Sequence, residues 1–205
     1  MKSTSLVIIF FAVAAGAVVL YSMQGGKSPE EYAKEIQFER KEKDLFMMSG
    51  EDSPFKGSKE VFQGLKYFPP DLRYSINAAL VPIQNKKMII LPTSDGKEKK
   101  YLEHAYAEFE LDGITNKLLI LEMTEIGPYR GTLYLAFADK TSANETYGAG
   151  RYLEVKKVPG ASSVLLDFNK AYNPYCAYSD NFSCPFPPGE NVLQVAIRAG
   201  EKSYH

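Results

Sequence analysis

Six polar side chains in the last third of the chain are the residues best suited to chemistry. They are Arg151, Asp167, Asn169, Asn173, Tyr178 and Glu201. An arginine fork beside asparagine amides can hold a carboxylate or a phosphate through paired hydrogen bonds. The carboxylates of Asp167 and Glu201 have the chemistry of a cooperating acid and base. The sequence therefore predicts a site for a small polar or anionic ligand, and the alternative is a hydrolase that uses Asp167 and Glu201.

The same residues also have a purely structural interpretation. Arg151 can form an ion pair with Asp167 or Asp139 instead of holding a ligand. Asn173 stands before Pro174, and asparagine in a proline-rich loop is typical of turns, where its side chain bonds to the nearby backbone. In that interpretation the protein is a structural one, and its polar loop, residues 169–191, is a plug that binds no ligand.

The only two cysteines, Cys176 and Cys184, stand in a loop rich in proline, asparagine and tyrosine. In an oxidising compartment the sequence predicts a disulfide between them, which would stabilise the fold by about 2.5 kcal/mol on a chain-entropy estimate. Zinc needs two further ligands, and His104 is the only histidine before the terminal His205. We therefore predict no metal site, no cofactor and no Cys–His nucleophile.

No motif in the sequence specifies a reaction. There is no Gly-x-Ser-x-Gly nucleophile motif, and the Tyr-Gly-Ala-Gly run at 147–150 precedes a predicted strand, whereas phosphate-binding glycine loops open a helix. Basic and acidic residues are interspersed and give a formal net charge of -1. No basic cluster is available to replace phosphate counterions, so nucleic acid is not an expected partner.

The first 26 residues form a separate segment that is expected to meet a membrane. Lys2 precedes an uncharged stretch from Leu6 to Met23, which is long enough for a span of about 27 Å. We expect an uncleaved anchor, and a cleaved signal peptide is the alternative. Residues 27–205 are expected to form one domain. Because the positively charged start stays on the cytoplasmic side, this domain is expected on the other side of the membrane, in the cell envelope. The expected partners are the membrane, a small polar ligand or an envelope protein.

Two helices are expected before the strands begin. Ser28 opens the first one, with proline and a capping glutamate in its first turn, and the helix runs to about Ser49, where Gly50 ends it. The charged run Glu39–Asp44 within it is predicted to face solvent. A second, short helix is predicted at Lys59–Leu65, before two prolines.

Apolar and polar residues alternate after Asp71, which is the pattern of half-buried strands. Eight strands are expected, at residues 74–80, 88–91, 100–111, 117–123, 131–138, 151–156, 164–168 and 192–199. Asp-Gly, Gly-Pro and Pro-Gly turns join them, and no helical stretch separates them. The sequence therefore predicts a mainly β domain, an antiparallel β-barrel or sandwich of about eight strands with N-terminal helices.

Several irregular motifs resemble those of a known family. They are the run 147–153 (Tyr-Gly-Ala-Gly-Arg-Tyr-Leu), the run 166–174 (Leu-Asp-Phe-Asn-Lys-Ala-Tyr-Asn-Pro), Cys176-Ala177-Tyr178, the run 184–188 (Cys-Pro-Phe-Pro-Pro), Asn191 and Ala199-Gly200-Glu201. This pattern resembles the bacterial family known as domain of unknown function 1684, over about Glu30 to Tyr204. The resemblance implies a bacterial source and no activity. It also implies that the polar loop is the distinctive part of the protein.

Overall fold

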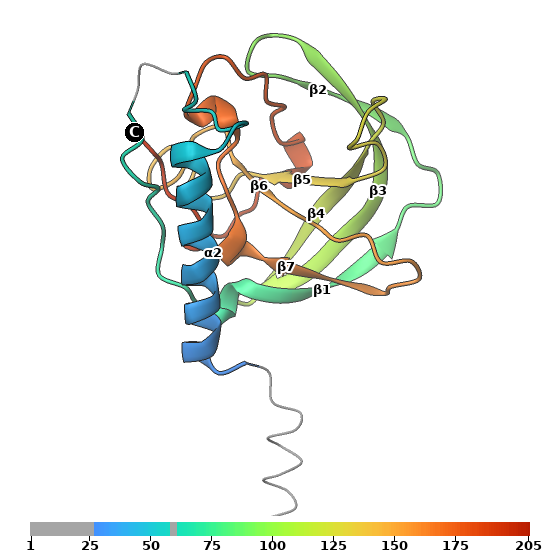
Figure 1. Ribbon diagram of the computed structural model, residues 1–205. Helices are drawn as coiled ribbons and strands as arrows, with labels where there is room; N and C mark the ends of the chain where they lie inside the picture. The colour runs from blue at the N-terminus through green and yellow to red at the C-terminus, as the bar shows by residue number, and fades with distance from the viewer. Residues whose placement is uncertain (1–26, 58–60) are drawn as a thin grey trace, which may run out of the picture.

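The computed structural model describes residues 27–57 and 61–205. The predicted anchor or signal segment, residues 1–26, lies outside this range. Within the range, no helix is long and apolar enough to cross a membrane. One antiparallel sheet curls into a half-barrel, and the helix α2 stands at its open side (Figure 1). The predicted mainly β fold is confirmed.

The helix α2, Pro29–Ser49, begins as its sequence predicts. The Ser28 hydroxyl oxygen accepts a hydrogen bond from the backbone N–H of Glu31 at 3.2 Å, and the Glu31 carboxylate accepts one from the N–H of Ser28 at 3.1 Å. This reciprocal capping satisfies two of the donors that a helix start leaves free. The inner face of α2 packs on the rest of the domain through the buried residues Tyr32, Ile36 and Met47.

Seven strands form the sheet. They are β1 Ser75–Pro82, β2 Met88–Pro92, β3 Glu98–Leu111, β4 Ile114–Met123, β5 Leu133–Phe137, β6 Arg151–Leu153 and β7 Ser163–Asp167. Their order is β6-β5-β4-β3-β1-β7, and β2 also pairs with β3. Every pairing is antiparallel. Seven of the eight predicted strands are therefore confirmed.

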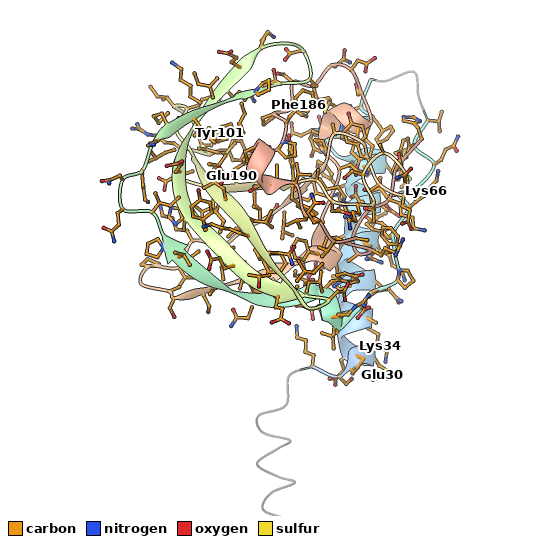
Figure 2. The ribbon with its side chains drawn as sticks, turned by 180° about the vertical axis from the view of Figure 1, so that it is seen from behind. Glu30, Lys34, Lys66, Tyr101, Phe186 and Glu190 are labelled. Atoms are coloured by element: carbon orange, nitrogen blue, oxygen red, sulfur yellow. The ribbon has the colours of Figure 1, made fainter. Side chains whose placement is uncertain are left out.

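The central strand β4 is buried on both faces of the sheet. Its alternate residues belong to two separate hydrophobic clusters, because successive side chains of a strand point to opposite sides. The segment after Cys184 covers one of these clusters. The Tyr134 hydroxyl donates to the carbonyl of Pro185 at 3.1 Å, and the N–H of Phe186 donates to the carbonyl of Pro92 at 2.9 Å. Figure 2 shows how side chains fill the space between the curled sheet and α2.

The eighth predicted strand, residues 192–199, does not join the sheet. The predicted alternation is present, because Leu193, Val195, Ile197 and Ala199 are buried. However, the segment bonds to the chain that follows β5. The N–H of Leu193 donates to the carbonyl of Ala138 at 2.8 Å, and the N–H of Lys140 donates to the carbonyl of Val195 at 3.1 Å. These side chains therefore fill the core of the half-barrel, and the chain ends beside α2 (Figure 1).

The short helix predicted at Lys59–Leu65 is wrong for residues 61–65, which are irregular. Phe62 and Leu65 pack against a cluster that contains Met47 of α2 and Tyr178. The N–H of Leu65 also donates to the Asp44 carboxylate of α2 at 3.3 Å. These contacts with α2 replace local helical bonds, as tertiary packing often overrides propensity.

Candidate ligand-binding site

Glu201 is the buried carboxylate at the centre of the candidate site, with 1% of its surface exposed. It follows Gly200, whose φ of 75° lies in the left-handed region. A Cβ atom at position 200 would lie 2.5 Å from the carbonyl oxygen of Ala171, so a larger residue would displace the backbone. Glycine thus lets the chain pass Ala171 closely at the point where the Glu201 N–H donates to that carbonyl at 2.9 Å.

Two neighbours from the polar loop hold the Glu201 carboxylate. The Tyr178 hydroxyl and the backbone N–H of Asn173 both donate to Oε2, the latter at 2.9 Å. Burial and the negative charge of Glu201 raise the pKa of Tyr178, so the phenol keeps its proton and remains a donor. The amide nitrogen of Asn173 donates to the carbonyl of Lys202 at 2.9 Å.

Two cations of α2 reach the same place. Lys43 Nζ lies 2.6 Å from Glu201 Oε1 and 4.4 Å from the centre of the Tyr172 ring. The Arg40 guanidinium lies 4.4 Å from the centre of the Tyr67 ring and donates to the carbonyl of Phe68 at 2.8 Å. Burial lowers the pKa of Arg40 from its usual value. The helix α2 therefore covers the carboxylate with positive charge.

Four buried side-chain atoms in this cluster have no hydrogen-bond partner among residues 27–57 and 61–205. They are Arg40 Nε, the Tyr67 hydroxyl, Asn173 Oδ1 and Glu201 Oε1, which has the Lys43 ammonium beside it but receives no directed hydrogen bond. Contacts join the four residues, because Tyr67 stacks on Arg40 and forms an antiparallel bridge with Glu201, which binds Asn173. A buried polar atom without a partner costs about 1–3 kcal/mol, so this cluster has hydrogen-bonding capacity that a polar molecule could complete.

Asp167 and Asn169 form a neighbouring network at the end of β7. The Tyr32 hydroxyl of α2 donates to Asp167 Oδ1 at 2.6 Å, and the side-chain amide of Asn169 donates to the same oxygen at 3.2 Å. Asn169 also exchanges two hydrogen bonds of 2.8 Å with the backbone of Asp71. Burial and the Asp167 carboxylate raise the pKa of Tyr32. This network joins the segment before β1 to the end of β7 and to α2.

Arg151 lies in a third network, inside the half-barrel, and is 1% exposed. Its NH2 donates to Asp139 Oδ2 and to the carbonyl of Ile197, both at 2.9 Å. Its NH1 donates to the carbonyls of Ala199 and Glu201, at 2.5 and 3.1 Å. The arginine therefore holds the C-terminal segment against the chain after β5. Of the two carboxylates expected as its partner, Asp139 is the one that it pairs with.

The structure thus distributes the six predicted residues over three networks. Glu201, Asn173 and Tyr178 come together under α2. Asp167 and Asn169 lie next to them, where Arg40 NH2 donates to the backbone carbonyl of Asn169 at 3.4 Å. Asp167 and Glu201 bind different partners, so these contacts do not pair them as an acid and a base. The ligand-binding role of the six residues stays a prediction.

Asn191, one of the motif residues of the family pattern, links two strands of the sheet. Its side-chain nitrogen donates to the carbonyls of Leu119 and Ala136, at 2.9 and 2.8 Å. Its side-chain oxygen accepts from the N–H of Leu119 at 2.7 Å. The residue is fully buried, and it satisfies backbone groups that β4 and β5 leave open between them.

Cys176 and Cys184 are free thiols in the structure, and the disulfide between them stays a prediction. The N–H of Cys176 donates to the sulfur of Cys184 at 3.3 Å, so the two residues are in contact. The described residues contain no group of three or more His, Cys, Asp or Glu side chains placed to hold a metal ion.

Arg40 and Lys43 were missed because the run Glu39–Asp44 was predicted to face solvent. Both residues are half-buried, whereas Lys41 and Glu42 between them are exposed. A signal was present in the sequence. Arg40 and Lys43 stand four and seven residues after Ile36, and this spacing places them on the same face of a helix as that buried residue.

The fold and the site define a class of protein: a half-barrel β domain with a buried polar cluster under its N-terminal helix. The chain matches the family described as Protein of unknown function (DUF1684) over residues 60–202. The chain is also similar to an uncharacterised protein from Haloarcula marismortui whose solution NMR structure is known. The two sequences are 36% identical, the structures superpose with a TM-score of 0.63, and the match covers 86% of this chain and 97% of that chain. No curated protein matches the chain. The chain therefore belongs to the DUF1684 family, as its motifs predicted, and its bacterial source stays a prediction.

Proposed function

We propose that this protein is an exported, membrane-anchored domain that binds a small polar ligand under α2. The single observation that carries the proposal is the group of four unpartnered buried atoms around Glu201. The uncharged stretch from Leu6 to Met23 supports the anchor, and α2 begins at Pro29, shortly after it in the sequence.

The charges around the site favour a neutral ligand over an anionic one. Arg40 and Lys43 contribute two positive charges, and Glu201 and Asp44 contribute two negative ones. The carboxylate of Asp44 belongs to this set because its charge raises the pKa of Tyr67. The unpartnered atoms comprise donors, on Arg40 and Tyr67, and acceptors, on Asn173 and Glu201. A small molecule that carries both hydroxyl or amide donors and acceptors matches this set.

The surface beside Tyr67 offers an approach to the cluster. A hollow of about 290 Å³ is lined by Gln63, Gly64, Leu65, Lys66, Tyr204 and His205. Lys66 precedes Tyr67 in the chain, and its carbonyl accepts from the N–H of Lys202, which follows Glu201. Ligand entry is therefore proposed along this segment, beside the end of α2.

A thermal-shift screen of the purified full chain tests the proposal. The panel contains monosaccharides, polyols and small amides, because these neutral molecules carry both donors and acceptors. A ligand that binds the folded state at 100 times its Kd stabilises it by about 2.7 kcal/mol, which raises the melting temperature measurably. We expect at least one such compound for the wild type.

Variants of α2 provide the matched control for this screen. Lys43→Met and Glu201→Gln change the site, whereas Lys41→Met changes an exposed lysine on the opposite side of the same helix. The shift is expected to persist in Lys41→Met and to disappear in the other two variants. Equal shifts in all three variants, or none in the wild type, would contradict the proposal.

A further inference from the structure

The two thiols of the polar loop lie against each other but differ in exposure. Cys176 is half-buried, in the short 3-10 helix η3 (Tyr175–Ala177), and Cys184 is buried. The N–H of Cys176 donates to the sulfur of Cys184 at 3.3 Å. The Tyr147 hydroxyl lies 3.9 Å from the sulfur of Cys176. Cys176 is therefore the more exposed residue of the pair, and its backbone is in contact with the sulfur of Cys184.

The backbone around Cys184 is fixed to the turn between β2 and β3. The N–H of Cys184 donates to the Ser94 hydroxyl oxygen at 3.1 Å, and the N–H of Ser94 donates to the carbonyl of Cys184 at 2.9 Å. The Ser183 hydroxyl donates to Asp95 at 2.5 Å. These bonds hold the backbone of Cys184 against the turn independently of the state of the two thiols.

The two thiols also differ in acidity. The hydrogen bond that Cys184 donates lowers the pKa of Cys176 to about 6, and the bonds from Ser94 and Tyr147 act in the same direction. Its partnership with Cys176 and its burial raise the pKa of Cys184. The ionisable groups that interact electrostatically with one or both thiols are Lys99, Tyr101, Tyr147, Tyr152 and Tyr172. Asp180 acts on Tyr147. At neutral pH the negative charge therefore rests on Cys176, the more exposed residue of the pair.

We propose that Cys176 and Cys184 form a reversible thiol–disulfide exchange site, in which Cys176 attacks and Cys184 resolves. The Cys176 thiolate attacks one sulfur of a disulfide oxidant, forms a mixed disulfide and releases the first thiolate of the oxidant. Cys184 gives its proton to the thiolate released in the first step and attacks the sulfur of Cys176, which forms the internal disulfide and releases the second thiolate of the oxidant. Two protein thiols are thus oxidised, and one disulfide of the oxidant is reduced to two thiols.

This assignment goes beyond a structural disulfide, because it gives the two sulfurs different roles. A structural bridge needs only that the two sulfurs meet. An exchange site needs an accessible sulfur with thiolate character and a second thiol close behind it, and this pair meets both conditions. The proposal does not depend on a ligand under α2.

Oxidised glutathione tests the order of the two steps on the purified, reduced full chain. Mass spectrometry is expected to show the internal disulfide in the wild type and a stable glutathione adduct in Cys184→Ser. In Cys176→Ser the adduct is expected to form at least about ten-fold more slowly, because the remaining thiol is buried and protonated. An equal rate in the two variants, or a wild type that keeps the adduct without closing the bridge, would overturn the assignment.

A measurement on the unaltered chain guards against misfolded variants. Limited alkylation with iodoacetamide, followed by peptide mapping, is expected to label Cys176 before Cys184. The labelling rate should follow a titration centred near pH 6. If Cys184 is labelled first, or if the rate of Cys176 rises only above about pH 8, as for an ordinary thiol, the proposal fails.

Discussion

The Arg151 network and the Glu201 cluster each contain a buried charged side chain, yet the hydrogen bonds around the two are completed to different degrees. Each charged residue follows a glycine with positive φ, Gly150 or Gly200. Both terminal nitrogens of Arg151 donate to protein acceptors, whereas its Nε has no partner in the part of the chain that the structure describes. Around Glu201, four side-chain atoms lack one. The comparison teaches that a buried charge enclosed by its own chain supports the fold, whereas one with unmatched neighbours is suited to binding.

The largest effect is expected from Arg151→Met. The variant leaves the Asp139 carboxylate buried without its cation, and breaking such a pair costs about 3–5 kcal/mol of folding free energy. Urea denaturation, monitored by circular dichroism, measures this loss of folding free energy.

The double variant Arg151→Met with Asp139→Asn sharpens this prediction. In the native protein Asp139 accepts a hydrogen bond from the N–H of Ile197 at 3.1 Å. The asparagine oxygen can still accept this bond, and the asparagine side chain carries no charge. More than half of the lost stability should return. If Arg151→Met alone lowers the free energy of unfolding by less than about 1 kcal/mol, the Arg151 network is not a closed structural one.

Asn191→Ala is expected to follow, with a loss of about 2 kcal/mol, because backbone groups of Leu119 and Ala136 lose their partners inside the protein. Asn144→Ala is the matched control, since Asn144 is exposed, and it should change the unfolding free energy by less than about 0.5 kcal/mol. Equal losses in thermal or urea unfolding would contradict the structural role of Asn191.

A smaller effect, about 1 kcal/mol, is expected when Lys43→Met is compared with Lys41→Met in the absence of ligand. The Lys43 side chain is 29% exposed, and Tyr178 and Asn173 still donate to Glu201 after its removal. A loss as large as that of Arg151→Met would place the Glu201 cluster among the closed structural networks and would remove the contrast between the two regions.

The smallest expected effect is a pH dependence through His104 on β3. Burial is the main influence on the pKa of His104 and lowers it, against the opposing contact with Glu122 at 3.3 Å. In the unfolded chain His104 binds a proton below about pH 6.5, whereas in the folded chain it does so only at a lower pH. Stability should therefore fall as the pH drops below this value, and His104→Gln should flatten the slope. If the stability of His104→Gln depends on pH as steeply as that of the wild type, His104 is not the origin of this pH dependence.

The sequence predicted the regular parts of the fold well and the site only in part. The capping box at Ser28 and the alternation of the first seven strands depend on near neighbours, so they are readable. Residues 192–199 also alternate, but whether such a segment joins a sheet or fills its interior depends on chain far away in the sequence. The grouping of Glu201 with Asn173 and Tyr178 likewise depends on tertiary contacts, as does the inward turn of Arg40 and Lys43.

A high-resolution crystal structure of the full chain, grown with the compound selected by thermal shift, tests the central claim most directly. We predict electron density for that compound within hydrogen-bond distance of the Tyr67 hydroxyl, Asn173 Oδ1 and Glu201 Oε1. Side chains that pair with one another instead, or a single ordered water in their midst, would contradict a ligand-binding function for the cluster under α2.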